Sequence, residues 1–95
     1  MTAGARKVRI RDDVVLREED EGAFLFDPVN GRLCYLNQMG IDILKMCRQP
    51  VAENDIVHAL AASYPETSPT LIAADCGAFL KELNRLGFIE NEGKR

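Results

Sequence analysis

The sequence predicts an α+β domain in which a three-stranded antiparallel sheet is followed by three helices, in a winged-helix-like arrangement. Three observations support this fold class. In the first half, short runs of β-favouring residues flank a turn sequence, Asp27–Gly31. In the second half, apolar residues recur at helical spacing, and proline or glycine separates the successive segments. With 95 residues, the chain is expected to form one domain with a modest core.

The domain boundaries follow from composition. We expect a disordered start over residues 1–7, a single domain over residues 8–90 and a solvated tail over residues 91–95. Residues 8–21 carry many charges of both signs, a pattern typical of a solvated face. Within that run, Val14–Arg17 is predicted to form the first strand.

The strongest local signal is a hairpin. Its strands are expected around Phe24–Phe26 and Leu33–Leu36, because both runs are rich in β-favouring side chains. Between them, Pro28 presets one turn dihedral and the Asn-Gly pair ending at Gly31 tolerates positive φ. Alternation along the second strand places Leu33 and Tyr35 on one face and Cys34 and Leu36 on the other.

The first predicted helix follows this hairpin directly, over Gln38–Cys47, with Asn37 as its N-cap. Gly40 falls on the apolar stripe of this helix, although glycine disfavours helix interiors by up to about 1 kcal/mol relative to alanine. Close packing against a neighbouring backbone would be one reason for a glycine there. Pro50 then prevents the helix from continuing.

Two more helices are predicted downstream, over Glu53–Tyr64 and Pro69–Leu86. Ser68 is expected to cap the last helix, since proline suits the first helical position that follows it. Gly87 is expected to end that helix. Residues 88–90 are predicted either to add a short strand or to pack on the core.

Composition and charge argue against several classes of protein. The net charge of −3 lacks the basic field that nucleic-acid binding needs. No apolar run approaches the roughly 20 residues required to span a bilayer, and the basic N-terminus lacks the apolar segment of a signal peptide. The three cysteines are odd in number and far apart, which indicates reduced thiols and a cytoplasmic protein.

No catalytic set, metal site or cofactor site is predicted. His58 is the only histidine, and it is expected at a surface or boundary position. Cys47 and Cys76 fall on apolar helical stripes and are expected to behave as small hydrophobic residues. No cysteine pair has the C-x-x-C spacing of a zinc or redox site, and residues 18–21 lack the pattern of a calcium loop. The sequence also lacks a glycine-rich phosphate loop.

With no catalytic, metal or cofactor site predicted, the remaining candidate for a functional site is the edge strand. A small sheet has at least one free edge, and Leu33–Leu36 is short, apolar and uncharged. An edge strand beside a helix is a natural binding place for an extended peptide. The alternatives are a DNA-binding or transcription-associated winged helix and a dimer in which the edge pairs with itself. Charges in the last helix cancel, Lys81 and Arg85 against Asp75 and Glu82, which weakens the DNA alternative.

The whole order of segments resembles the PqqD family, named for the peptide chaperone of pyrroloquinoline quinone (PQQ) biosynthesis. The segments that carry the resemblance are "LCYLNQMGIDILKMC", "DIVHALAASYP" and "IAADCGAFLKELNRLGFIE". Their most specific pieces are Leu36-Asn37, Ile43-Leu44 and Tyr64-Pro65, together with the spacing of Asp75, Phe79, Leu80 and Leu83. The resemblance extends over residues 8–90.

The resemblance implies a RiPP recognition element, a non-catalytic domain that binds the leader part of a ribosomally made precursor peptide. In such domains the leader adds as a strand to the third strand, lies against the third helix and is presented to a maturation enzyme, often of the radical SAM type. The implied peptide-binding residues are Arg32, Leu33, Cys34, Tyr35 and Leu36 in the strand and Asp75, Ala78, Phe79, Glu82 and Arg85 in the helix.

Two points stay open from the sequence. Either Cys34 and Leu36 or Leu33 and Tyr35 would line the groove beside the helix, depending on the register. The chain also departs from members of the quinone pathway, with "DPVNGR" at the hairpin turn and "RQP" after the first helix. The expected partners are therefore a leader peptide of unassigned pathway and a maturation enzyme, with no nucleic acid and no membrane. The protein itself is expected to be a monomer or an edge-paired dimer.

Overall fold

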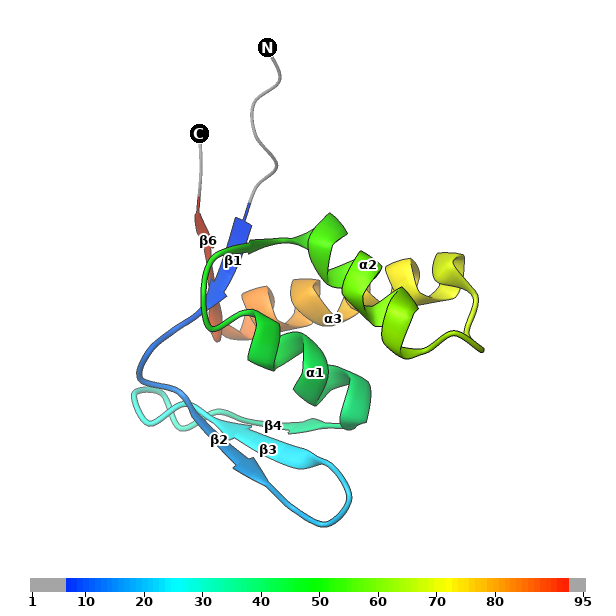
Figure 1. The fold of residues 1–95 in the computed structure, drawn as a ribbon. Coiled ribbons are helices and arrows are strands. Elements are labelled where there is room, and N and C mark those ends of the chain that lie inside the picture. The colour runs from blue at the N-terminus through cyan, green and yellow to red at the C-terminus, as the bar shows by residue number, and fades with distance from the viewer. Residues whose placement is uncertain (1–6, 93–95) are drawn as a thin grey trace.

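The computed structural model describes residues 7–92, which form two three-stranded antiparallel sheets and three helices (Figure 1). One sheet has the strand order β5-β1-β6, made of β5 (Val51–Ala52), β1 (Lys7–Ile10) and β6 (Ile89–Glu92). The other has the order β2-β3-β4, made of β2 (Val15–Glu18), β3 (Ala23–Phe26) and β4 (Leu33–Leu36). The helices are α1 (Gln38–Met46), α2 (Glu53–Ser63) and α3 (Pro69–Leu86). The predicted α+β class, with antiparallel strands and three helices, is confirmed.

The hairpin that the sequence predicts forms β3 and β4. Its register pairs Phe26 with Leu33 and Ala23 with Leu36. At the turn, the Asp27 amide donates a hydrogen bond of 2.9 Å to the Arg32 carbonyl oxygen. Gly31 has a φ of 77°, the positive value that the Asn-Gly pair favours. The strand predicted over Val14–Arg17 is also present, shifted by one residue to β2, and it completes this sheet.

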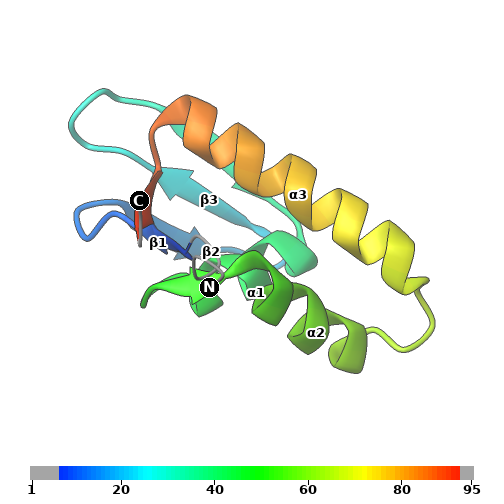
Figure 2. The same cartoon turned by 90° about the horizontal axis from the view of Figure 1, so that it is seen from above.

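All three helices lie on the same side of the β2-β3-β4 sheet (Figure 1). The inward-facing side chains of this sheet, Leu25 and Leu36 among them, join the core with apolar residues of the helices such as Ile43 and Leu83. Figure 2 shows α3 running alongside the β3–β4 hairpin, on the side of the sheet that β4 occupies. The core therefore fixes α3 beside the edge strand.

The helix limits differ little from those expected. The Asn37 side-chain oxygen accepts a 2.8 Å hydrogen bond from the Gly40 amide and so caps α1, as predicted. Helix α1 ends one residue early, at Met46, and α2 likewise ends at Ser63. Helix α3 has the predicted limits and ends at Gly87, whose φ is 85°. The expected Ser68 side-chain cap is wrong: that side chain makes no capping hydrogen bond, and Pro at the first helical position leaves one fewer amide to satisfy.

The second sheet was not predicted as a whole. Of its strands, only one was expected, as an alternative for residues 88–90, and there Phe88 is buried while Ile89–Glu92 forms β6. Its strands are short. Strands β1 and β6 pair across the two ends of the described chain, with Lys7 opposite Glu92 and Ile10 opposite Ile89, and β5 comes from the middle of the chain. Such long-range pairing leaves little local pattern in the sequence. It also corrects the boundaries, because Lys7 lies in β1, and Asn91 and Glu92 belong to β6 rather than to a solvated tail. Residues 1–6 and 93–95 lie outside the described residues.

The charged run over residues 8–21 is more than a solvated face. Val8 and Ile10 are buried in the core, and Arg9 pairs with Glu90 and Glu92 of β6. Arg11 pairs with the fully buried carboxylate of Asp27. A mixed-charge run therefore holds buried and paired side chains here, because β1 packs against the core on one face. None of the helices within residues 7–92 combines the length and apolar character needed to cross a bilayer.

Candidate functional site

The outer edge of β4 carries unpaired backbone groups. In an antiparallel pair, residues alternate between those that hydrogen-bond to the partner strand and those whose backbone groups point away. The Asp27–Arg32 hydrogen bond fixes that alternation, since these residues lie opposite each other one step beyond the Phe26–Leu33 pair. The N–H and C=O groups of Leu33 and Tyr35 therefore point away from β3. Within residues 7–92, β4 is the last strand of its sheet, and the Tyr35 carbonyl accepts only a long contact from the Cys34 thiol, at 3.7 Å, so these four groups are available to another strand.

The side chains of β4 alternate in the same way. Leu36 is 1% exposed and Cys34 is half-buried, and both face the helices. Leu33 and Tyr35, 61% and 57% exposed, face the opposite side of the sheet. Of the two pairs that the sequence left open, Cys34 and Leu36 are thus the pair on the α3 side.

Helix α3 approaches this inward-facing pair of β4 residues. A Cβ atom built on Gly40 would lie 3.3 Å from Cζ of Phe79 and 3.4 Å from Cβ of Leu36, so Phe79 packs where β4 passes into α1. Glu82, one turn further along α3, is near enough to Cys34 for its charge to act on that thiol. Burial, followed by the charge of Glu82, raises the pKa of Cys34. The absence of a side chain at Gly40 is what lets Phe79 sit this close. The close packing expected at Gly40 is present, but it is against side chains and not against a neighbouring backbone.

The charged residues predicted on α3 are exposed, and two of them pair with each other. Arg85 donates to Glu82 through Nε, at 3.0 Å, and through Nη2. This pairing lowers the pKa of Glu82 and raises that of Arg85. Asp75 and Ala78 are exposed on the preceding turn of α3, and helical spacing places them on the same side as Phe79 and Glu82.

The structure thus brings some of the predicted site residues together and separates others. Cys34, Leu36, Phe79 and Glu82 meet between β4 and α3, whereas the side chains of Leu33 and Tyr35 lie on the other face of the sheet. Arg32 sits in the turn before β4, where its amide donates to the Asn30 side chain at 2.9 Å. The sequence reasoning did not single out the outward-facing side chains of the neighbouring strands, Val15, Phe24 and Phe26. Their alternation along "VVLRE" and "AFLF" is the signal that marks them.

The remaining candidates for chemistry do not assemble into a site within the described residues. Cys47 and Cys76 are fully buried, and burial raises their pKa values to about 12 and about 11. Both thiols are therefore protonated at neutral pH and unsuited to act as nucleophiles. His58 is exposed on α2. Residues 7–92 contain no group of three or more histidine, cysteine or acidic side chains arranged to hold a metal ion.

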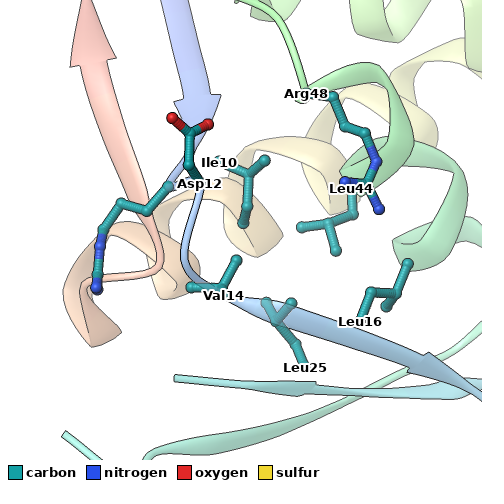
Figure 3. A pocket seen from close by; sticks show the side chains of 8 residues that line it. Ile10, Asp12, Val14, Leu16, Leu25, Leu44 and Arg48 are labelled. Atoms are coloured by element: carbon teal, nitrogen blue, oxygen red, sulfur yellow. The ribbon is translucent and has the colours of Figure 1, made fainter. Parts of the chain in front are cut away.

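A small cavity lies where the two sheets meet α1 (Figure 3). Its volume is about 80 Å³, and its lining combines apolar side chains, from Ile10, Val14, Leu16, Leu25 and Leu44, with the polar residues Arg11, Asp12 and Arg48. Pockets for small organic ligands usually measure roughly 300–1,000 Å³. This cavity is therefore a packing gap at the junction of the sheets, too small for a substrate or cofactor.

A protein-family model matches most of the chain. The family model described as "Coenzyme PQQ synthesis protein D (PqqD)" matches residues 22–89, which include the hairpin, all three helices and the β4–α3 region. A comparison with curated protein sequences gave no match.

Several solved structures share the fold. "TbiB1 in Complex with the TbiA(beta) Leader Peptide" has a TM-score of 0.74 and 24% identity, over 86% of this chain and 94% of that one. "Lasso peptide synthetase B1 complexed with the leader peptide" has a TM-score of 0.73 and 23% identity, over 87% and 96%. The PqqD truncation of Methylobacterium extorquens PqqCD, described as a functional and stand-alone RiPP recognition element, has a TM-score of 0.72 and 23% identity, over 88% of both chains.

Proposed function

The chain belongs to the PqqD family, and we propose that it is a non-catalytic carrier of a ribosomally made precursor peptide. The leader segment of that peptide adds as a strand to the open edge of β4 and lies against α3. The carrier then presents the peptide to a maturation enzyme of the radical SAM type in the cytoplasm. The proposal extends to the class of peptide and not to the quinone pathway, because the chain departs from the quinone-pathway pattern at two turns.

The open edge of β4 is the observation that carries the proposal. Four backbone groups of Leu33 and Tyr35 point away from the sheet, and a bound strand would satisfy all of them. Each such hydrogen bond contributes a net 0.5–1.5 kcal/mol or so. Strand addition obtains its affinity from these backbone bonds and its specificity from the side chains beside them.

The other edge of the same sheet is less suited to a peptide. Strand β2 ends in Arg17 and Glu18, and Glu18 pairs with Lys45 of α1 at 3.2 Å. A peptide strand added there would meet charged, partly engaged side chains. At β4, by contrast, the half-buried side chains of Cys34 and Phe79 offer apolar contacts, whereas Leu36 is already buried in the core. We therefore propose that alternate leader side chains at the groove are apolar.

The similar structures support this proposal. Two were solved with a leader peptide bound, and a third is described as a stand-alone RiPP recognition element. The absence of an assembled catalytic or metal-binding group within residues 7–92 is consistent with a carrier. We also propose that the helices and the β3–β4 hairpin form a winged-helix-like arrangement. A DNA-binding role has no comparable support, since Glu82 already neutralises Arg85 on α3.

Amide hydrogen exchange tests the binding mode residue by residue. In the free protein, the amides of Leu33 and Tyr35 should exchange quickly, whereas those of Cys34 and Leu36 should be protected by their bonds to β3. Addition of the precursor peptide should slow exchange at Leu33 and Tyr35 at least tenfold and leave Cys34 and Leu36 protected. Binding with unchanged exchange at Leu33 and Tyr35 would show that the peptide occupies another surface.

The oligomeric state is part of the same proposal. We expect a monomer, because pairing of β4 with itself in a dimer would occupy the groups that the peptide needs. Sedimentation velocity over a hundredfold range of concentration checks this. A dimer that the precursor peptide dissociates would identify the free edge as a self-association site that competes with the peptide.

A further inference from the structure

The face of the β2-β3-β4 sheet that points away from the helices is apolar. Figure 1 shows that no described segment covers it. Strand register places its side chains in two rows, with Val15, Phe26 and Leu33 opposite one another in one row and Arg17, Phe24 and Tyr35 in the other. We call this surface the outer face, made of Val15, Phe24, Phe26, Leu33 and Tyr35, all of which are exposed large hydrophobic residues.

The aromatic side chains of the outer face are held in place. The Tyr35 and Phe24 rings meet edge to face, with centroids 5.5 Å apart and planes at 66°. The Tyr35 hydroxyl donates a 2.7 Å hydrogen bond to the Glu21 carbonyl oxygen. Beside them, a shallow hollow of about 590 Å³ is lined by Val15, Phe24, Phe26 and Leu33, with Arg17 and Glu19 at its rim. A preformed aromatic surface loses little conformational entropy when a partner covers it.

The outer face has the size of a transient protein contact. Phe24 and Phe26 are 37% and 40% exposed, and Tyr35, Leu33 and Val15 are at least half exposed. With about 200 Å² for a fully exposed aromatic side chain, the apolar area is on the order of 400–500 Å². Patches of this size on a monomer are often functional. A stable interface of standard size takes about 800 Å² from each partner, and obligate homodimers take more, so this face alone is too small for a permanent dimer.

One end of the outer face is acidic. The turn between β2 and β3 carries Glu19, Asp20 and Glu21, all exposed. Arg17 pairs with Glu19 at 3.0 Å. Within residues 7–92, no lysine or arginine pairs with Asp20 or Glu21. A second copy of this acidic chain would bring the same carboxylates to the interface, whereas a basic partner would neutralise them.

We infer that the outer face docks the enzyme that receives the peptide, through an apolar patch of that enzyme bordered by lysine or arginine side chains. This inference rests on the proposed carrier function. The peptide would occupy the edge and the inner side of β4, and the enzyme would occupy the opposite side of the sheet. Carrier, peptide and enzyme would then form one complex, without the enzyme displacing the peptide from its groove.

The test separates docking from peptide binding. The probes are a purified candidate precursor peptide and a purified candidate maturation enzyme, both chosen from the genes that neighbour the gene for this chain. Val15→Ser combined with Phe26→Ser removes apolar area from β2 and β3, away from the β4 edge, and Leu71→Ser removes an exposed hydrophobic side chain from the start of α3 as the matched control. Asp20→Lys reverses one charge of the acidic turn, and Glu66→Lys does so on the remote exposed loop between α2 and α3. Neither lysine variant touches the core.

We expect the double serine variant to weaken enzyme affinity at least tenfold and Asp20→Lys at least threefold. Both controls should stay within twofold, as should the peptide affinity of every variant. Enzyme affinity that does not distinguish outer-face variants from controls would overturn the inference. So would a wild-type dimer that the serine variant converts to a monomer, which would assign the face to self-association. Failure of the wild-type protein to bind the precursor peptide would instead contradict the proposed function.

Discussion

Arg11 lies within 2.6 Å of the buried carboxylate of Asp27, its Nη1 donating to Oδ2, and the same nitrogen donates to the Gly87 carbonyl oxygen at 2.9 Å. One guanidinium therefore joins the link between β1 and β2, the turn that begins after β3 and the end of α3. Asp27 also accepts from the Val29 amide at 2.9 Å, which shapes the turn before β4. The ion pair thus holds the β3–β4 hairpin and α3, the two sides of the peptide groove, to the same point.

Breaking this pair should destabilise the whole domain. Asp27→Asn keeps the shape of the side chain but leaves the partly buried charge of Arg11 without its main partner. We expect the melting temperature to fall by roughly 10 °C or more. Asp12→Asn, at an exposed side chain that pairs with Arg9, should change it by less than about 3 °C. Thermal unfolding followed by circular dichroism measures both.

The same substitution should change the pH dependence of stability. The hydrogen bond from Arg11 holds the pKa of Asp27 below its ordinary value. A lowered carboxyl pKa in the folded state stabilises the protein above the unfolded value of about 3.9, and that contribution is lost as the pH falls through the folded pKa. The stability gap between wild type and Asp27→Asn should therefore be full at pH 7 and shrink below about pH 4. A gap that stays constant down to pH 2 would show that the carboxylate charge is not what stabilises the fold.

Proline at position 33 should impair peptide binding without unfolding the sheet. The Leu33 amide points to the open edge, and proline is tolerated in edge strands where its missing N–H would face solvent. Leu33→Pro removes one hydrogen bond to the added strand, so peptide affinity should fall about three- to tenfold. Leu33→Ala, which keeps the amide, is the control and should bind the peptide within about twofold of wild type. Fluorescence anisotropy with labelled precursor peptide measures both variants.

Charge on the two faces of β4 should have unequal effects. Cys34 faces α3 and lies near Glu82, so Cys34→Asp would place a second carboxylate in an apolar groove. We expect at least a tenfold loss of peptide affinity, whereas Leu33→Asp, on the outer face, should cost less than about threefold. Calorimetric titration of both variants with the precursor peptide provides the comparison. Equal losses would mean that the peptide contacts both sides of the strand.

Thiol reactivity offers a probe of the free edge. In the native protein, iodoacetamide should modify Cys34 first, because Cys47 and Cys76 are buried and have pKa values of about 12 and about 11. The raised pKa of Cys34 means that its alkylation should accelerate as the pH rises above about 8.5. Bound precursor peptide should slow this reaction at least fivefold. Mass spectrometry counts the modified sites, and denatured protein, in which all three thiols react, gives the reference.

The hairpin, the three helices and the caps at Asn37 and Gly87 followed from local patterns, whereas the expected Ser68 cap did not form. Asn37 caps α1 because its side-chain oxygen accepts a hydrogen bond from a free amide of the first turn. Gly87 ends α3 because glycine readily adopts the positive φ found after a helix C-terminus. The β5-β1-β6 sheet could not be foreseen in this way. Its pairing of Lys7 with Glu92 depends on contacts between the ends of the described chain, and its two- to four-residue strands carry almost no period of their own.

The sequence predicted which strand and which helix form the candidate site, but not which face of the strand points toward the helix. Sequence alternation separates Leu33 from Cys34, yet only the position of α3 decides which of them faces the groove. The role of Asp27 was hidden for a similar reason. In a turn rich in polar residues, nothing in the sequence distinguishes a solvated carboxylate from one buried against Arg11, which lies sixteen residues earlier in the chain.

The alternation along β4 has a consequence for how an occupied carrier differs from an empty one. A strand added at Leu33 and Tyr35 would lie about 4.8 Å beyond β4, and every second side chain of it would emerge next to theirs. The outer face would then extend over four strands, and the side chains on the fourth strand would be those of the bound peptide. An enzyme that binds this face would contact peptide side chains only when the peptide is bound. It could therefore distinguish the loaded protein from the empty one without any conformational change in the protein.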